Sequence, residues 1–452
     1  MPGLVNSARG KSNSQNYCRN YAHEKGKVKT MKKRVSKKTK ALKTVLFSLF
    51  ALVSIFVLLK LDLGIFTELY DQKKEQKYHE ENIEHNDKNS NIDNKADEQR
   101  SQESKQKEQG GEQSQAKRTL TINAVGDIMM GRRIASNIEK QGGNYMTVLE
   151  EVAPVLSNAD IVFANVEAPF TDRTKGLVGI KEGGKYVLKN PLKSFEAFKM
   201  CGFNLVSLAN NHILDYYKEG VLDTYKLFEE NGIAHSGTGE NLDKAREPAI
   251  MQKNGIKVGL LSYTDMAEVV YKGNPPLSFV AGQNKFGVAP KKRDYIIEDI
   301  KKTKPLVDLL IISLHWGIEE SFDIADYQIK LAHEIIDSGA DIIFGHHPHQ
   351  FQGIEIYDGK PIFYSLGNFV FDQNDPENQE SFIATLKYEE TELKDLKLLP
   401  IRTINKNKVV LVKGDEAEQL LKRQQLLCER LQTKSFCMDN FLTVNIGAGK
   451  QE

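Results

Sequence analysis

Short apolar runs alternate with amphipathic stretches along the chain from residue 119 onward. Runs of large and β-branched apolar residues predict seven strands, over residues 120–125, 161–164, 205–208, 258–262, 309–314, 342–344 and 362–365. Apolar residues three to four positions apart predict helices between them, over residues 145–156, 192–200, 221–230, 293–302 and 327–337. Such alternation is typical of an α/β fold. We therefore predict an α/β domain over residues 118–405 and a C-terminal extension with a helix over residues 406–452.

The first 117 residues follow a different pattern. Residues 44–59 are uncharged and almost wholly apolar, which predicts a transmembrane anchor over residues 44–61. Residues 1–43 contain 13 Lys or Arg and one acidic residue, so this tail is expected to stay in the cytoplasm. Residues 62–117 are polar and poor in aliphatic side chains, which predicts a disordered tether. We expect a single-pass protein of the cell membrane with an extracellular C-terminal domain.

Two other interpretations of the N-terminal region are weaker. A cleaved signal peptide would also have basic and apolar parts, but no small-x-small cleavage site and no lipobox Cys follow Leu59. The basic tail is compatible with nucleic-acid binding, yet its place next to the apolar run favours anionic headgroups, so no nucleic acid is expected as a partner. Among the scattered cysteines, Cys428 and Cys437 are compatible with a small-loop disulfide, and Cys201 is expected to be buried.

Polar residues follow directly after most of the predicted strands. In α/β folds, ligands collect at the carboxyl ends of the strands, so these positions are the candidates for a site. They are Asp127, Asn165, Glu167, Asn211, His212, His315, His347 and His349. Carboxylate and amide oxygens together with imidazole nitrogens, without thiolates, are ligands suited to a divalent metal ion such as Mn, Fe, Zn or Mg.

Each candidate also has a purely structural interpretation. A strand that ends in Gly126-Asp127 is more often followed by a turn, and Asn211 is compatible with an Asx-turn or a helix cap. His315 is compatible with a packed residue at a strand end. The segment 347–349, His-Pro-His, is the strongest signal, because proline stiffens the backbone and core histidines rarely occur so close together.

The order of these motifs resembles the CapA family of bacterial capsule proteins, a branch of the calcineurin-like metallophosphatase superfamily. The resemblance runs from residue 119 to about residue 399. It is carried by Gly126 to Arg132, Asn165 to Glu167, Asn210 to His212 with Asp215, His315 to Gly317, Gly345 to His349, and Tyr364 to Phe369. It implies a four-layer α/β/β/α sandwich with a metal site at the strand ends.

The resemblance also implies roles for individual residues. Asn211 would bind metal, His212 would protonate a leaving group or hold the substrate, and Asp215 would orient His212. The remaining metal ligands would be Asp127, Glu167, His315, His347 and His349. Asn165 would either bind metal or position water.

This chain departs from ordinary metallophosphatases at two places. It lacks their Asp-x-His and Gly-Asp-x-x-Asp motifs, so only Asp127 occupies the first strand end and Glu167 would replace the bridging carboxylate. The number of metal ions is therefore left open. Residues 318–322 also differ from the family pattern, and this loop is expected to shape substrate access.

The resemblance implies a component of poly-γ-glutamate biosynthesis or export that acts beside polytopic capsule-synthesis proteins and the polymer chain. A metal-dependent phosphohydrolase acting on a cell-envelope phosphoester and a catalytically silent scaffold are the alternatives, so the sequence leaves catalysis itself open. Residues 118–452 contain 46 acidic and 39 basic residues, so a polyanion would be repelled on average. Its binding would require a local basic patch or a bridging metal ion.

Overall fold

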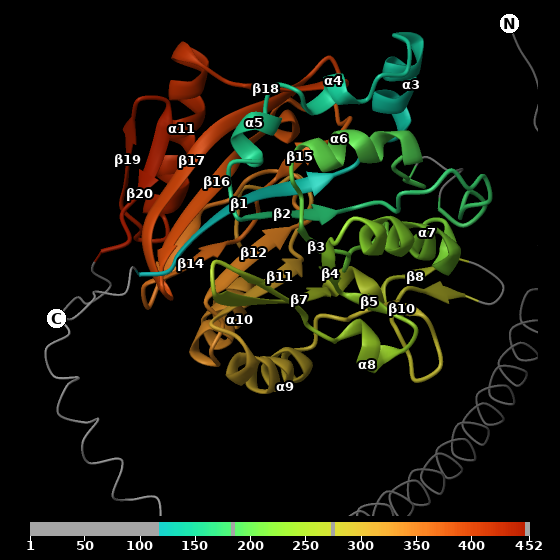
Figure 1. Cartoon of the computed structure of the whole chain (residues 1–452), viewed down its shortest axis with the longest axis horizontal. Coiled ribbons are helices and arrows are strands. Elements are labelled where there is room, and N and C mark those ends of the chain that lie inside the picture. Colours follow the sequence, from blue (N-terminus) through green and yellow to red (C-terminus); the bar gives the residue numbers. More distant parts are fainter. Residues whose placement is uncertain (1–116, 182–185, 273–275, 448–452) are drawn as a thin grey trace, which may run out of the picture. The chain divides into compact units, whose positions relative to one another are not determined.

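The computed structural model describes residues 117–181, 186–272 and 276–447, which form a mixed α/β fold as expected (Figure 1). A ten-stranded sheet has the order β19-β20-β17-β16-β1-β2-β3-β4, with β15 beside β1 and β18 beside β17. Its strands are β1 (Thr119–Ile128), β2 (Ile161–Val166), β3 (Leu205–Ser207), β4 (Ala234–Ser236), β15 (Asn368–Val370), β16 (Glu380–Glu389), β17 (Glu392–Ile404), β18 (Lys408–Leu411), β19 (Ser435–Met438) and β20 (Phe441–Val444).

A six-stranded sheet has the order β13-β14-β12-β11-β7-β6. Its strands are β6 (Ala249–Lys253), β7 (Ile256–Thr264), β11 (Leu309–His315), β12 (Ile342–His346), β13 (Ile354–Tyr357) and β14 (Lys360–Phe363). Two short ribbons accompany the sheets. They pair β5 (Thr238–Gly239) with β10 (Gly287–Val288), and β8 (Val270–Tyr271) with β9 (Leu277–Ser278).

The two sheets pack face to face through an apolar layer. Phe163 of β2 stacks on Phe344 of β12 with ring centroids 4.7 Å apart, and Ile122 and Ile311 belong to the same buried cluster. Side chains of α11 also belong to this cluster. Because each sheet buries its inner face against the other, each outer face needs helices to cover it.

Helices cover the outer faces of both sheets, so the layers follow the order helix, sheet, sheet, helix (Figure 1). The helices on the ten-stranded sheet are α3 (Arg132–Lys140), α4 (Met146–Leu149), α5 (Ala153–Leu156), α6 (Phe195–Met200) and α7 (Tyr217–Glu230). Those on the six-stranded side are α8 (Leu242–Ala245), α9 (Arg293–Thr303) and α10 (Asp326–Asp337). The segment after residue 405 contributes α11 (Gly414–Glu429) and the strands β18, β19 and β20.

All seven predicted strands are present, and several are longer than predicted. The single helix predicted over residues 145–156 is wrong, because the chain turns at residues 150–152 and forms α4 and α5 instead. Pro154 lies in the first turn of α5, where its missing N–H costs nothing, whereas the interior of one long helix would have needed that donor. The helix predicted from residue 192 begins with a 3₁₀ turn, Leu192–Ser194, before α6.

Cys428 and Cys437, for which the sequence left a small-loop disulfide open, do not form one in this structure. Cys428 is a buried free thiol in α11, and Cys437 is an exposed free thiol on β19. Cys201 is buried, as predicted.

No helix in the described parts of the chain is long and apolar enough to cross a membrane. The predicted tail (1–43), the predicted anchor (44–61) and all but the last residue of the predicted tether lie outside the described residues. The anchor and its topology therefore stay predictions.

Candidate metal centre

Strand register gathers the candidate residues at one edge of both sheets. In the ten-stranded sheet, Asp127 of β1 lies beside Asn165 of β2 and beside Asn368 of β15. In the six-stranded sheet, His315 of β11 lies beside His346 of β12. The two rows meet because the sheets face each other, so strand ends far apart in sequence form one site.

Two glycines allow the backbones around this site to approach closely. A Cβ atom on Gly126 would lie 1.8 Å from the carbonyl oxygen of Gly367, and one on Gly345 would lie 1.9 Å from the carbonyl oxygen of Tyr364. No other residue type fits at either position without moving the backbone. The glycines that precede Asp127 and His346 are therefore explained by close packing beside the site.

Asp127, Glu167 and His349 form the centre of the cluster. Their candidate ligand atoms all lie within 4.8 Å of one another, and all three side chains are buried. His349 Nδ1 lies 3.6 Å from Asp127 Oδ2 and 3.9 Å from Glu167 Oε2. A group of this size and composition is suited to a divalent cation.

His315 connects this centre to the other predicted ligands. Its Nε2 atom lies 3.5 Å from Glu167 Oε1, 2.9 Å from Asn211 Oδ1 and 3.2 Å from His347 Nδ1. The predicted ligands Asp127, Glu167, Asn211, His315, His347 and His349 are thus joined by close contacts in one buried cluster.

Asn165 lies behind the ligand atoms. Its Nδ2 donates a hydrogen bond to Asp127 Oδ1 at 2.8 Å and lies 3.2 Å from His315 Nδ1. Its Oδ1 accepts a hydrogen bond from Asn210 Nδ2 at 3.2 Å. In this orientation Asn165 fixes the positions of Asp127 and His315, and its oxygen faces away from them.

His212 forms a second group with Asp215 and Lys181. His212 Nδ1 lies 2.8 Å from Asp215 Oδ2, and the Lys181 ammonium group lies 2.5 Å from Asp215 Oδ1. The same ammonium group donates to the Asn211 carbonyl oxygen at 2.7 Å and lies 4.8 Å from the ring centre of Tyr271. Lys181 therefore fixes the loop that carries the candidate ligand Asn211 and the candidate acid His212.

Three contributors were not identified from the sequence. His346 Nδ1 lies 3.1 Å from Asp127 Oδ1, and Asn368 Oδ1 lies 2.9 Å from His349 Nδ1. Both residues fall within recognised motifs, but only the strand register shows that they reach the cluster. Lys181 lies in a loop between β2 and α6, far from any strand end, so no sequence pattern marked it.

The sequence of this chain was compared with models of known protein families. Residues 121–373 match the family described as bacterial capsule synthesis protein PGA_cap, and this match covers more than half of the chain. The chain belongs to this family.

Curated relatives agree with the assignment to the PGA_cap family. The chain is 35% identical over 274 residues to the capsule biosynthesis protein CapA of Bacillus anthracis, covering 59% of this chain and 63% of that protein. It is 36% identical over 267 residues to the PGA biosynthesis protein CapA of Bacillus subtilis (strain 168), covering 59% of this chain and 67% of that one. The match thus spans less than two thirds of the B. anthracis relative. The resemblance seen in the sequence motifs is confirmed.

One solved structure shows a distant similarity to this PGA_cap family member. A putative 5'-nucleotidase from Staphylococcus aureus covers 70% of this chain with 13% sequence identity and a TM-score of 0.36, the match spanning 58% of that protein. A similarity at this level carries no argument about function.

The electrostatics of the PGA_cap site favour a bound cation. Burial raises the pKa of Glu167 well above its usual range, and the nearby Asp127 carboxylate raises it further. Neither carboxylate oxygen of Glu167 has a hydrogen-bond partner among the described residues. A buried carboxylate without hydrogen bonds is costly, so this residue fits the role of a metal ligand.

The surrounding groups fit the same role. Burial raises the pKa of Asp127, but the imidazoles of His346 and His349 outweigh this effect and hold it well below its usual range. Burial, helped by His349, lowers the pKa of His347 to about 3, so its ring is neutral and keeps a lone pair. An ionised carboxylate and a neutral imidazole are the forms that bind metals.

Backbone conformation at the histidine loop is also unusual. His347 has φ +97° and His349 has φ +61°, values in the left-handed region that residues with side chains rarely adopt. Such strain persists when the surrounding structure holds it, and it is common at functional sites. Here the strained backbone occurs at the two histidines whose side chains lie in the cluster.

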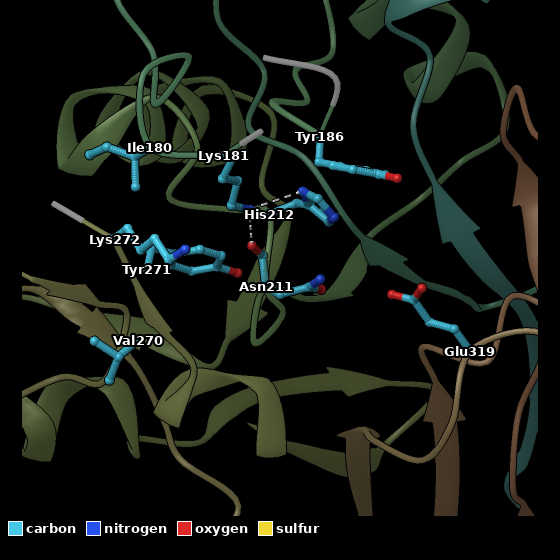
Figure 2. A pocket seen from close by; sticks show the side chains of 9 residues that line it. All are labelled: Ile180, Lys181, Tyr186, Asn211, His212, Val270, Tyr271, Lys272 and Glu319. Carbon is cyan, nitrogen blue, oxygen red and sulfur yellow. Dashed lines mark hydrogen bonds between the residues drawn. The ribbon is translucent and has the colours of Figure 1, made fainter. Parts of the chain in front are cut away.

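A pocket of about 520 Å³ opens beside Asn211 and His212 (Figure 2). Its walls are formed by Ile180, Lys181, Tyr186, Asn211, His212, Val270, Tyr271, Lys272 and Glu319. This volume lies within the usual range of small-ligand sites. The pocket joins the candidate ligand Asn211 to solvent, so a substrate has a route to the cluster.

Proposed function

We propose that this chain is a membrane-anchored extracellular component of poly-γ-glutamate biosynthesis or export, with a metal site of the metallophosphatase type in its outer domain. The observation that supports this most is the buried Glu167 carboxylate, without a hydrogen-bond partner among the described residues, next to Asp127 and His349 in a chain of the capsule synthesis family. The helix, sheet, sheet, helix order of the layers also agrees with this proposal.

The proposed cofactor is a divalent ion. Asp127, Glu167 and His349 would hold it, and Asn211, His315 and His347 complete the ligand set. When bound, such an ion lowers the pKa of a coordinated water and polarises a carbonyl or phosphoryl oxygen. Mn, Fe, Zn and Mg all accept this mixture of ligands.

His212 is the proposed proton carrier. Its Nδ1 atom is engaged by Asp215, which fixes the ring and leaves Nε2 as the nitrogen available to a ligand in the pocket. Lys181 in turn compensates the buried Asp215 charge. The three residues together orient one imidazole at the entrance to the metal cluster.

The basic N-terminal tail and the apolar run after it motivate the proposed location. The anchor would cross the cell membrane once, with the tail in the cytoplasm and residues 118–452 outside. There the domain would meet the polymer chain and polytopic capsule-synthesis proteins. Relatives named for capsule and PGA biosynthesis support the link to this polymer.

A metal-dependent phosphohydrolase acting on a cell-envelope phosphoester is the second candidate. The specific observation in its favour is the pair of His212 and Asp215 beside a cluster of carboxylate and imidazole ligands, because this combination suits hydrolysis in general. The same pair suits cleavage or transfer at an amide, so the site alone does not choose the substrate.

One comparison separates the candidates. The full-length chain and its His347→Ala variant are purified in detergent, their bound metal is measured, and hydrolysis of model phosphoesters is assayed. In parallel, polymer is measured in cells that carry each version. Polymer lost without phosphoester turnover in either version supports the assembly role, whereas turnover that disappears with His347 supports the hydrolase. Polymer unaffected by His347→Ala would contradict the assembly role and favour a silent scaffold.

A further inference from the structure

Two charged side chains face the pocket from opposite sides. Figure 2 shows Glu319 on one side and Lys272 on the other, with Asn211 and His212 between them. Both charged residues are exposed, and neither has an ion pair or a hydrogen bond through its charged group with another described residue. The pocket therefore has one negative and one positive wall.

The remaining pocket residues do not cancel this polarity. The ammonium group of Lys181 is paired with Asp215 and directed at the backbone of Asn211, so its charge is matched internally. Tyr271, Ile180 and Val270 supply apolar surface on the lysine side. Lys272 is the lining cation without a carboxylate partner among the described residues.

Glu319 lies near the metal cluster as well as the pocket. Its charge contributes to raising the pKa of Glu167 in the cluster, and also that of Tyr271 on the far wall, although burial is the main cause at both residues. The Glu320 backbone N–H donates to the Pro348 carbonyl oxygen at 2.9 Å, which ties the Glu319 loop to the His-Pro-His segment. The negative wall is thus held in place by the loop that carries the candidate ligands His347 and His349.

We propose that this pocket binds the free amino end of a short acidic chain linked by amides. The terminal ammonium group faces Glu319, and a carboxylate from a following unit faces Lys272. The intervening amide lies at Asn211 and His212, where the proton carrier and the metal cluster meet. This inference rests on the proposed function, and it specifies which part of the polymer the site recognises.

The proposal explains how a domain with excess negative charge can bind a negatively charged polymer. Residues 118–452 contain more acidic than basic residues, so an internal stretch of a polyanion is repelled on average. An amino end carries a positive charge that an internal unit lacks, and Glu319 would favour it. A free amino acid carries both of its charges on one unit, whereas the proposed ligand presents them on different units, one to each wall.

Binding of defined oligomers tests this directly. The full-length chain, purified in detergent and loaded with Mn, is titrated calorimetrically with a γ-linked glutamate pentamer, with the same pentamer acetylated at its amino end, and with free glutamate. We expect the free pentamer to bind about fivefold more tightly than the acetylated one, the effect of one partly exposed charge pair. Free glutamate is expected to bind more weakly than either.

Two substitutions, each with a control, test which charge of the ligand each wall of the pocket binds. Glu319→Gln should abolish the preference for the free amino end, while Glu320→Gln, which removes the same charge one residue away, should keep it. Lys272→Gln should weaken both pentamers by a similar factor of about five and preserve the preference. Lys218→Gln, at an exposed lysine that does not line the pocket, should leave both affinities unchanged. Both pocket residues are exposed, so the variants are expected to fold, and unchanged melting temperatures check this.

Several results would overturn the proposal. Equal binding of free and acetylated pentamers, or binding of free glutamate as tight as the pentamer, would refute recognition of a chain end while poly-γ-glutamate binding stands. Loss of bound Mn in Glu319→Gln would identify Glu319 as a metal ligand and refute its proposed role. No binding of either pentamer to the metal-loaded wild type would contradict the proposed function itself.

Discussion

Glu167 and Asp299 are both buried carboxylates, but their surroundings differ. Asp299 on α9 accepts hydrogen bonds from Arg246 at both of its oxygens, each 2.8 Å long, and another from the Tyr263 hydroxyl. Glu167 lies among carboxylates and imidazoles and accepts no hydrogen bond from any described residue. The chain therefore completes one acidic cluster internally, whereas the other is arranged as the proposed cation site requires.

This contrast separates a structural cluster from a functional one. Around Asp299 and Glu298, burial lowers the pKa of Arg246, but hydrogen bonds and charge attraction outweigh it, so the guanidinium pKa is raised and its ion pairs stay intact. Around Glu167, burial acts against the charged form, and the carboxyl oxygens have no hydrogen-bond partner among the described residues; the nearest basic groups are the imidazoles of His315 and His349, 3.5 and 3.9 Å away. In this chain, an acidic residue indicates a candidate binding site where its pKa is shifted and its carboxyl oxygens lack hydrogen-bond partners.

The largest expected effect is a loss of stability when the ion-paired cluster around Asp299 is disrupted. Asp299→Asn removes the charge that faces Arg246 and leaves a partly buried guanidinium with Glu298 as its remaining acidic partner. We expect a loss of about 3 kcal/mol in the free energy of unfolding, measured by urea titration. Metal affinity should not change, because this cluster lies apart from the candidate ligands. Weakened metal binding in a folded Asp299→Asn protein would show that the two clusters are coupled.

The next substitution, Glu167→Gln, is expected to stabilise the metal-free protein, whereas Asp299→Asn destabilises it. Glu167→Gln should lower metal affinity by about 100-fold or more, because it removes a proposed ligand. The metal-free variant should nevertheless be more stable than the metal-free wild type at pH 7, since it removes a carboxyl group whose charged form burial disfavours. Competition with a chelator gives the affinity, and urea titration in the presence of EDTA gives the stability. A destabilised metal-free variant would contradict the contrast with Asp299.

A smaller effect is expected from the residue that orients His349. Asn368→Ala removes the amide oxygen that His349 Nδ1 contacts at 2.9 Å, and we expect metal affinity to fall about tenfold. Asn378→Ala is the matched control, because it removes a buried amide in the neighbouring 3₁₀ turn, Pro376–Gln379, and the Asn378 side chain has no hydrogen-bond partner among the described residues. Equal losses in both variants would mean that the effect is general loosening of this region.

The smallest effect concerns pH at a histidine with a purely structural environment. His235 on β4 stacks on Tyr225, and burial lowers its pKa to about 4. The unfolded chain binds this proton below about pH 6.5, whereas the folded chain does not until about pH 4, so stability falls as pH drops through this window. His235→Gln should remove this acid sensitivity and flatten the dependence of stability on pH, measured by urea titration between pH 7 and pH 4. Parallel pH profiles for variant and wild type would refute this assignment.

Sequence patterns identified candidate ligands that the structure brings into one cluster, because parallel strands end at a common edge. Asp127, Asn211 and His315 each follow an apolar run, and this position alone was enough to bring them together. His346 was missed as a contributor because only the pairing of β11 with β12 places it beside His315. Lys181 was missed because its position depends on tertiary contacts of a loop, to which no periodicity applies.

The fold was predicted in the same uneven way. Near-continuous apolar runs identify buried parallel strands such as β11 and β12, but β17 alternates apolar and polar residues and was not found. The helix over residues 145–156 failed because its apolar spacing continues through the turn between α4 and α5. Apolar spacing reports which side chains face the core, and it does not by itself report where the backbone breaks.

Anomalous diffraction from crystals of the Mn-loaded full-length protein tests the central claim most directly. The account predicts a peak within coordinating distance of Glu167, Asp127 and His349, and its loss in crystals of Glu167→Gln soaked in the same way. A wild-type map without a peak at this position, or with the ion bound elsewhere while Glu167 contacts only protein, would contradict it.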